Sequence, residues 1–161
     1  MTQGPSVPTS WYFEDLVPGR RIRHARSATV GEVEGSWMAK LVMNTAQAHW
    51  NEHYLTDSPL GSGRVVFGLL TASMVVGLAG QDTADNALHE VGLDGLRFTA
   101  PVHHGDTLTA FTEVVAADPH PERDDVGVVR FRHWGLNQHD VVVFEGERTT
   151  VVKRRSHWGA P

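Results

Sequence analysis

The sequence predicts an α+β fold in which one antiparallel sheet wraps around a long apolar helix. Residues 64–80, RVVFGLLTASMVVGLAG, are apolar on nearly every side and too long for a typical strand, so they predict a buried central helix. Apolar and polar residues alternate beyond Gln81, which is the period of half-exposed strands. Four strands with short connections usually pair with one another, which favours an antiparallel sheet.

Three segments precede the central helix. Residues 20–30, RRIRHARSATV, predict a first strand, and residues 31–55 predict a helix with Trp37, Leu41 and Ala48 on one side. Residues 56–63, TDSPLGSG, are dense in proline, glycine and serine, so they predict a loop that leads into the central helix.

The strands after the central helix are marked by their alternation. The even-numbered residues of 108–114 share one face, and in 128–134 the odd-numbered residues face away from the even-numbered ones. Residues 136–140, LNQHD, predict a hairpin turn into a last strand at 141–153. Asp106 follows a glycine and is expected to cap a turn before a strand.

The length and composition predict a single globular domain. The chain has 161 residues, 40% of them hydrophobic and 20% charged, which is ordinary for a folded protein. We expect a flexible N-terminal arm at 1–10, the domain at 11–155 and a C-terminal tail at 156–161. The absence of cysteine excludes a disulfide framework and a thiol nucleophile.

Charge and hydropathy limit the partners. A net charge of -5 opposes a phosphate backbone, so we expect no nucleic acid, and the cluster Lys153-Arg154-Arg155 is expected to be a solvated tail. The first ten residues lack the succession of a signal peptide. The longest apolar run is shorter than the ~20 residues that span a bilayer, so we expect a cytoplasmic protein without a membrane partner.

The segment NTAQAHWNEHYL, residues 44–55, carries the candidate chemistry. Its letters HWNEH fit the H-x-x-E-H pattern of a zinc peptidase class, in which His49 and His53 would share a helical face with Glu52 beside them. A third ligand would have to come from the His103-His104 pair or Glu113, which nothing in the sequence marks as ligands. A motif without its structural context is weak, so no metal is expected.

An acid/base pair is the second hypothesis for this segment. Asn44 and His49 would point about 140° apart on an unbroken helix, because five residues rotate it by about 500°. They can address one water only if the chain bends between them. Without such a bend, Asn44 is a helix C-cap and His49 a partly exposed helix histidine.

Four stretches together resemble the MaoC-like dehydratase family. They are FEDLVPGRRI, LVMNTAQAHWNEHYL, GSGRVVFGLLTASMVVGLAG and LRFTAPVHHGDTLTAFTEV, and the resemblance spans residues 11–155. His49 matches the catalytic histidine of the family, Asn44 stands where an aspartate is usual, and Ala46 and Gln47 replace an Asn-Pro pair. The N-T-x-x-x-H version resembles the subgroup close to the mesaconyl-CoA hydratases.

The resemblance implies a hotdog fold and hydration or dehydration of a 2-enoyl or 3-hydroxyacyl thioester on CoA or a carrier protein. His49 would take the proton from water, Asn44 would hold that water, and the Gly68 N–H would stabilise the thioester oxygen as negative charge builds up. An amide cannot accept the proton itself, so proton transfer falls to His49. No metal or redox cofactor is implied, and the family implies at least a homodimer.

Further residues and functions remain open. The guanidinium groups of Arg64, Arg97 and Arg130 match CoA phosphates or a substrate carboxylate. The rings of Trp37, Trp50 and Phe67 could line an acyl pocket, with core packing as the default. A thioesterase using Glu52 or Asp57, and a hotdog subunit that only binds acyl thioesters, are the alternative functions. Gly68 could also serve helix–sheet packing alone.

Overall fold

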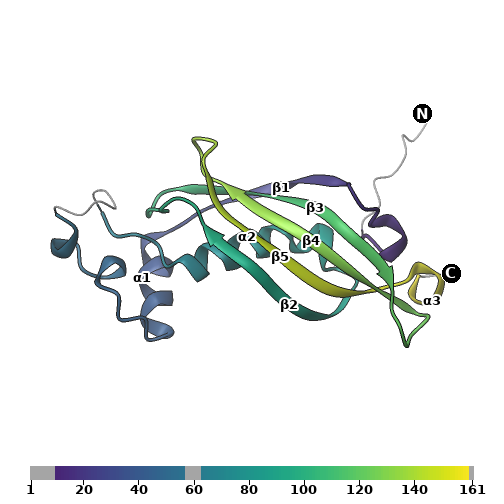
Figure 1. Ribbon diagram of the computed structural model, residues 1–161. Coiled ribbons are helices and arrows are strands. Elements are labelled where there is room, and N and C mark those ends of the chain that lie inside the picture. Colours follow the sequence, from purple (N-terminus) through teal and green to yellow (C-terminus); the bar gives the residue numbers. More distant parts are fainter. Residues whose placement is uncertain (1–9, 57–62, 160–161) are drawn as a thin grey trace.

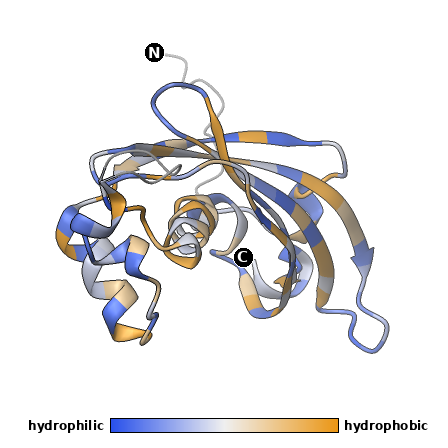
Figure 2. Cartoon of the chain, turned by 60° about the vertical axis from the view of Figure 1, so that its left-hand side comes forward, coloured by the Kyte–Doolittle hydropathy of each residue, from blue (hydrophilic) through white to orange (hydrophobic). Residues whose placement is uncertain are grey.

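A five-stranded antiparallel sheet curls around one central helix, as the sequence predicts (Figure 1). The computed structural model describes residues 10–56 and 63–159. The strand order is β1-β3-β4-β5-β2, so β1 and β2 form the two edges. Figure 2 shows the sheet arching over the apolar helix α2. The bounds are β1 Arg21–Thr29, β2 Ala87–Phe98, β3 Thr107–Pro119, β4 Val126–Leu136, β5 Val142–Lys153 and α2 Gly68–Thr83.

The predicted alternation of the strands is confirmed where the strands are central. Leu108, Ala110 and Val114 in β3 are fully buried, as are Val129 and Phe131 in β4. The edge strand β2, to which the alternation assigned no bounds, is exposed along most of its length. It pairs with β5 through three register shifts, which blur a period of two.

The central helix begins four residues later than the sequence predicts, because residues 64–67 are extended. Val65 pairs with His103 across an isolated bridge, and the Val66 N–H donates to the Val102 carbonyl at 2.7 Å. The helix then packs closely on the sheet. A side chain at Gly135 in β4 would lie 2.4 Å from Val75, so the glycine allows α2 to approach.

The predicted helix over residues 31–55 is confirmed only in its first part, and its extension beyond Leu41 is wrong. Helix α1 spans Glu32–Leu41 and ends where Met43 adopts a positive φ of 54°. The N–H groups of Met43 and Asn44 donate to Lys40 and Ala39 at 3.0 and 2.9 Å, which is the Schellman pattern of helix termination. Two short 3₁₀ turns follow, Gln47–His49 and His53–Leu55.

The exposure of α1 also differs from the prediction. Trp37 and Leu41, expected on the apolar side with Ala48, are 66% and 67% exposed, and the buried positions of α1 are Gly35 and Ala39. In Figure 1, α1 and the turns after it lie at one end of the sheet, while α3 lies at the other. The chain thus leaves the helix direction between Leu41 and Gln47.

The basic cluster at the end of β5 is not a solvated tail. Arg154 and Arg155 stack over the rings of Phe13 and Tyr12 at 4.6 and 4.7 Å from the ring centroids. Helix α3 (Arg155–Trp158) and the short turn Phe13–Asp15 thus meet beside β4. Phe13 packs where a side chain at Gly127 would stand only 2.2 Å away.

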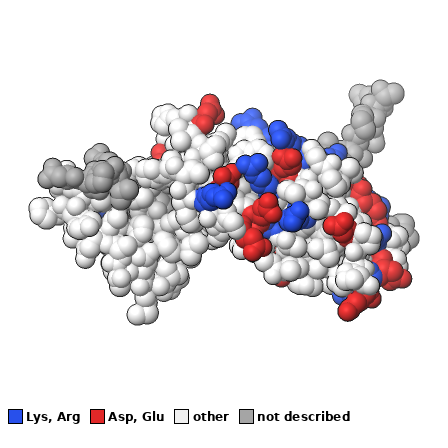
Figure 3. All heavy atoms as spheres, in the orientation of Figure 1, with Lys and Arg blue, Asp and Glu red and all other residues white. Residues whose placement is uncertain are grey.

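The outer face of the sheet carries paired charges. Arg132 and Glu145 approach to 2.7 Å, and Arg130 and Glu147 to 3.6 Å. On the face that Figure 3 shows, both signs are mixed over the strands and few charges lie on the end that holds α1. Among the described residues, no helix combines the length and the apolar character needed to cross a membrane.

Candidate active site

A pocket of about 390 Å³ lies at the N-terminal end of α2 and brings together two of the predicted catalytic residues, His49 and Gly68. One wall is the extended segment that enters the helix, and the opposite wall is the chain after β2. The lining residues are His49, Val65, Val66, Gly68, Thr71, Phe98, Thr99, Ala100, Pro101, Val102 and Val143.

His49 is held in one tautomer by the chain that enters α2. Its Nδ1 lies 2.7 Å from the carbonyl oxygen of Val65, and because a carbonyl only accepts, Nδ1 must carry the hydrogen. The ring also makes an edge contact with Phe67, with centroids 5.6 Å apart. Within the described residues Nε2 has no hydrogen-bond partner, so its lone pair is available for a proton.

The first turn of α2 supplies hydrogen-bond donors to the same pocket. The N–H groups of Leu70 and Thr71 both donate to the Phe67 carbonyl, at 2.9 and 3.2 Å. Neither Gly68 nor Leu69 has an acceptor for its N–H among the described residues. Free N–H groups and the helix dipole together favour negative charge at this end of a helix. A side chain at Gly68 would also come within 3.1 Å of the Phe98 ring.

Asn44 does not line this pocket. Its side-chain oxygen accepts the Ala46 N–H at 2.9 Å, and its backbone completes the end of α1. The bend that an Asn44–His49 pair requires is present, since α1 ends before Asn44 and His49 lies in a separate turn. The contacts of Asn44 are those of a turn residue, and its predicted role in holding water stays a prediction.

The predicted substrate-binding residues are spread over the molecule. Phe67 caps α2 beside His49, whereas Trp50 is 37% exposed and does not line the pocket. Arg97 lines a separate pocket with Arg132 and the carboxylates of Glu145 and Glu147. Their roles in substrate binding stay predictions.

Arg64 lies next to the site but is already occupied by protein groups. It donates to Glu52 and Ser36 at 2.8 and 2.7 Å and also pairs with Glu32. Glu52, the candidate base of a thioesterase, is therefore part of an ion pair. Asp57, the other candidate, lies outside the described residues.

The geometry that a zinc peptidase motif requires is absent from this segment. His49 and His53 belong to different 3₁₀ turns, so they do not share the face of one helix. Within residues 10–56 and 63–159, no three His, Asp or Glu side chains are grouped closely enough to hold a metal ion. The H-x-x-E-H pattern therefore occurs here without the single helix that would place both histidines on one face as metal ligands.

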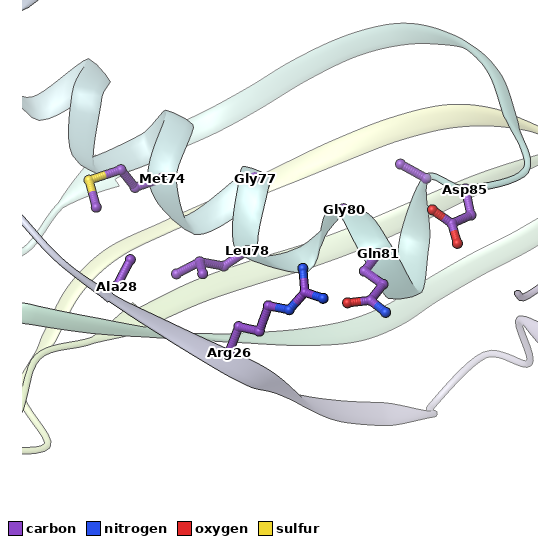
Figure 4. A pocket seen from close by; sticks show the side chains of 9 residues that line it. Arg26, Ala28, Met74, Gly77, Leu78, Gly80, Gln81 and Asp85 are labelled. Carbon is purple, nitrogen blue, oxygen red and sulfur yellow. The ribbon is translucent and has the colours of Figure 1, made fainter. Parts of the chain in front are cut away.

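A larger pocket, about 780 Å³, lies between β1 and the C-terminal half of α2 (Figure 4). Arg26 extends toward the helix there, near Gln81, and Asp85 closes the far end. This pocket contains neither His49 nor the free N–H groups of the helix. We therefore place the candidate active site at the smaller pocket, where a proton acceptor and donors for an anion face the same space.

Two contributors to the site were missed by sequence reasoning. Thr71 lies three residues after Gly68, which places it on the same side of α2, and this spacing could have indicated it. The Val65 carbonyl orients His49, but a backbone group leaves no signal in the residue letters. The Pro101-Val102 wall was recognised only as part of a motif.

Comparison with known proteins identifies the family. A family model described as mesaconyl-CoA hydratase matches residues 17–154. The chain is 30% identical over 160 residues to the mesaconyl-CoA hydratase of Haloarcula marismortui, covering 93% of this chain and 44% of that protein. It is 32% identical over 144 residues to the (R)-specific enoyl-CoA hydratase of Rhodospirillum rubrum, covering 89% of this chain and 93% of that protein.

Solved structures agree on the fold. A MaoC-domain dehydratase protein from Chloroflexus aurantiacus matches with a TM-score of 0.82 at 27% identity, over 90% of this chain and 45% of that chain. A Mycobacterium tuberculosis protein with a double hotdog fold matches with a TM-score of 0.70 at 23% identity, over 95% of this chain and 47% of that chain. The chain thus spans less than half the length of the mesaconyl-CoA hydratase that it matches. It has the hotdog fold and belongs to the mesaconyl-CoA hydratase family, within the MaoC-like dehydratases.

Proposed function

We propose that this chain adds water across the double bond of a 2-enoyl thioester, or removes water in the reverse reaction. The observation that carries the proposal is the pocket at the start of α2, which His49 and Gly68 line together, and in which the His49 Nε2 and the Gly68 N–H have no partner among the described residues. Hydration needs both a group that takes a proton from water and donors for the oxygen that becomes negative.

The chemistry follows from those groups. His49 Nε2 takes a proton from water while the water oxygen bonds to C3 of the substrate. The electron pair of the double bond moves toward the thioester, whose oxygen becomes an enolate stabilised by the Gly68 N–H and the helix dipole. The imidazolium then gives its proton to C2, and neutral His49 is restored. The apolar wall from Phe98 to Val102 excludes water from the acyl group.

The relatives support this reaction class. They are described as a mesaconyl-CoA hydratase and an (R)-specific enoyl-CoA hydratase, and both hydrate enoyl groups on CoA. We propose an acyl-CoA or acyl-carrier-protein substrate, with no metal or redox cofactor required by the steps above. A cytoplasmic location, predicted from the sequence, fits such a substrate.

We further propose that two copies of the chain pair along β2. This edge strand carries Glu90, Asp94 and Arg97 but also exposes apolar side chains, with Val91 58% and Leu93 52% exposed, whereas the opposite edge β1 carries Arg21, Arg23 and Arg26. Charged residues protect an edge from pairing, and apolar ones favour it. The match to half of a double-hotdog protein fits the need for a second hotdog unit. Light scattering of the native protein should give the mass of two chains. Val91→Lys should lower this mass, whereas Val33→Lys, at an exposed position of α1, should leave it unchanged.

The reaction is tested by the loss of enoyl-thioester absorbance with a panel of 2-enoyl-CoAs that includes mesaconyl-CoA. We expect hydration by the native protein and a loss of about 10² to 10⁴ in kcat for His49→Ala, the usual contribution of a positioned acid/base group. His53→Ala is the matched control, because His53 lies four residues away and does not line the pocket.

Three outcomes would contradict the proposal. Activity that survives His49→Ala would remove His49 from the chemistry. Release of free thiol without a 3-hydroxyacyl product would indicate a thioesterase. Binding of acyl-CoA without turnover of any substrate in the panel would favour the hotdog subunit that only binds.

A further inference from the structure

Arg64 makes three polar contacts that join separate segments around the candidate active site. Its Nε donates to Glu52 at 2.8 Å, one terminal nitrogen donates to Ser36 at 2.7 Å, and the other pairs with Glu32. Glu32 and Ser36 belong to α1, whereas Glu52 lies between the two 3₁₀ turns that carry His49 and His53. The Arg64 side chain is 19% exposed, whereas its partners Glu32 and Glu52 are 69% and 66% exposed.

The residue after Arg64 holds His49 directly. The Val65 N–H donates to the Ala48 carbonyl at 3.0 Å, and the Val65 carbonyl accepts the His49 ring N–H at 2.7 Å. The segment from Ala48 to Glu52, which carries His49, is therefore bonded to residues 64–65 at three points: at the Ala48 carbonyl, at the His49 imidazole and at the Glu52 carboxylate. The backbone of Val65 makes the first two contacts, and the guanidinium makes the third.

These contacts leave Arg64 poorly suited to bind substrate phosphate. Two carboxylates face its guanidinium, which offsets the positive charge that an anion would seek. Three of its five N–H groups are engaged on Glu52, Ser36 and Glu32. The planar fork matches the arrangement of its acceptors, a geometry that the point charge of lysine does not reproduce.

We propose that Arg64 is a positioning residue that fixes the orientation of His49, and not a ligand for CoA phosphate. The inference rests on the proposed hydratase function. A small displacement of a catalytic group can lower the rate by about 10²-fold without weakening substrate binding. Arg64→Met should therefore lower kcat by about tenfold to a hundredfold and leave KM nearly unchanged.

A pair of substrates separates positioning from phosphate binding. We would compare a 2-enoyl-CoA with the same acyl group on pantetheine, which lacks the nucleotide and its phosphates. Positioning predicts the same loss of kcat on both thioesters. A rise in KM for the CoA thioester alone would show a phosphate ligand and overturn the proposal. Arg123→Met, which removes an arginine paired with Asp125 far from α1, is the matched control.

A readout without turnover keeps the inference separable from the proposed function. ¹⁵N NMR of the His49 ring should show Nδ1 protonated in native protein and mixed tautomers in Arg64→Met, with faster hydrogen exchange of the Val65 amide. Those changes in a protein that hydrates nothing would sustain the positioning role while the hydratase function fails. An unchanged tautomer and exchange rate would overturn the positioning role.

A second variant decides the matter if Arg64→Met does not fold. Glu52→Ala removes one acceptor of the guanidinium at a side chain that is 66% exposed, so the fold should tolerate it. The proposal expects Glu52→Ala to lower kcat on both thioesters, with KM unchanged. A kcat equal to that of the native protein would overturn it.

Discussion

The two ends of helix α2 face opposite chemical surroundings. At the N-terminal end, His49 and Gly68 line an open pocket, and the His49 Nε2 and the Gly68 N–H have no partner among the described residues. At the C-terminal end, polar side chains are bonded in two groups, one of His24, Thr112, His133 and Asp82 and one of Arg148, Glu90, Thr83 and Thr150, and among the described residues only the buried Nε2 of His133 lies between them without a partner. The N-terminal end retains hydrogen-bonding capacity for a ligand, and the C-terminal end uses most of its capacity within the chain.

The C-terminal end of α2, called the closed end below, is the end where the helix residues Asp82 and Thr83 bond to polar side chains of the strands. Two histidines there share one hydroxyl. Thr112 Oγ1 lies 2.7 Å from His24 Nε2 and 2.7 Å from His133 Nδ1, and His24 Nδ1 lies 2.7 Å from Asp82. A hydroxyl has one hydrogen, so in the neutral pair one imidazole accepts from Thr112 and the other donates to it. The two rings thereby constrain each other's tautomers.

The same polar layer continues to the opposite edge of the sheet. Arg148, 4% exposed, donates to both oxygens of Glu90 in β2 and to the Thr83 hydroxyl at the end of α2. Its guanidinium lowers the pKa of Glu90. This layer separates an apolar cluster around Val75 from a second one around Phe131.

The comparison shows how one helix can serve both stability and function. Buried polar groups are costly unless they are paired, so the layer at the closed end fixes how α2 meets the strands. At the N-terminal end of α2, the open end, unpaired polar groups cost less free energy, because solvent reaches the pocket. Disturbing the layer should therefore change stability, whereas disturbing the pocket should change activity.

The largest expected effect comes from breaking the ion pair of the closed end. Glu90→Ala leaves the buried Arg148 charge without its carboxylate, and we expect a loss of about 2–3 kcal/mol in the free energy of unfolding, below the usual range for buried pairs because Glu90 is half exposed. Chemical denaturation measures the change. Glu147→Ala on the outer face is the control, with an expected loss under about 0.5 kcal/mol. Equal losses would mean that the layer is no more stabilising than a surface pair.

A smaller effect should appear as a dependence of stability on pH. Burial, together with the Arg148 and His24 charges, lowers the pKa of His133 to about 3 from 6.5. The unfolded chain therefore binds a proton below pH 6.5 that the folded chain does not, so stability is complete above that pH and falls as the pH falls. By pH 5 the loss from this group is about 2 kcal/mol.

The variant His133→Gln separates this contribution from that of the other groups. Unfolding free energies of both proteins from pH 7 to pH 5 should show a shallower dependence in the variant. His139→Gln, in the exposed hairpin, should keep the native dependence. Parallel curves for the native protein and His133→Gln would show that His133 is not held neutral in the folded state.

The sequence predicted the parts of the fold that depend on local patterns. Central strands such as β3 alternate strictly because one face is buried, and α2 is apolar enough to stand out. The end of α1 was missed because a methionine, Met43, occupies the left-handed position where a glycine would have marked it. The polar layer was not predictable from local pattern, since His24, Thr112, His133 and Arg148 meet only once the sheet is assembled.

The candidate site was predictable to a similar extent. His49 and Gly68 were found by resemblance to a family, and the structure brings them to one pocket. Asn44, chosen for its place in a motif, has the contacts of a turn residue, and its role in holding water stays a prediction. Arg64 was predicted to bind an anion of the substrate from its charge alone, because the sequence does not indicate the carboxylates of Glu32 and Glu52 that pair with it.

The smallest effect is expected from two glycines of α2, one near each end. A side chain at Gly80 would meet nothing within 4 Å, so Gly80→Ala should stabilise the protein by about 0.5–1 kcal/mol through helix propensity. Its activity should be unchanged. Gly68→Ala should instead lower activity and leave stability nearly unchanged, because the new methyl group stands 3.1 Å from Phe98 and enters the pocket.

Thermal unfolding and enoyl-CoA turnover of the two variants measure this contrast directly. We expect Gly68→Ala to lower turnover several-fold with a change in unfolding free energy within about 0.5 kcal/mol, typical of a mutation outside the packed core. Full activity in Gly68→Ala would show that the pocket tolerates a methyl group at this position, since alanine keeps the backbone N–H that is the proposed oxyanion donor. A loss of stability in Gly80→Ala would reveal that a second chain covers this face of α2, since the described chain leaves it open.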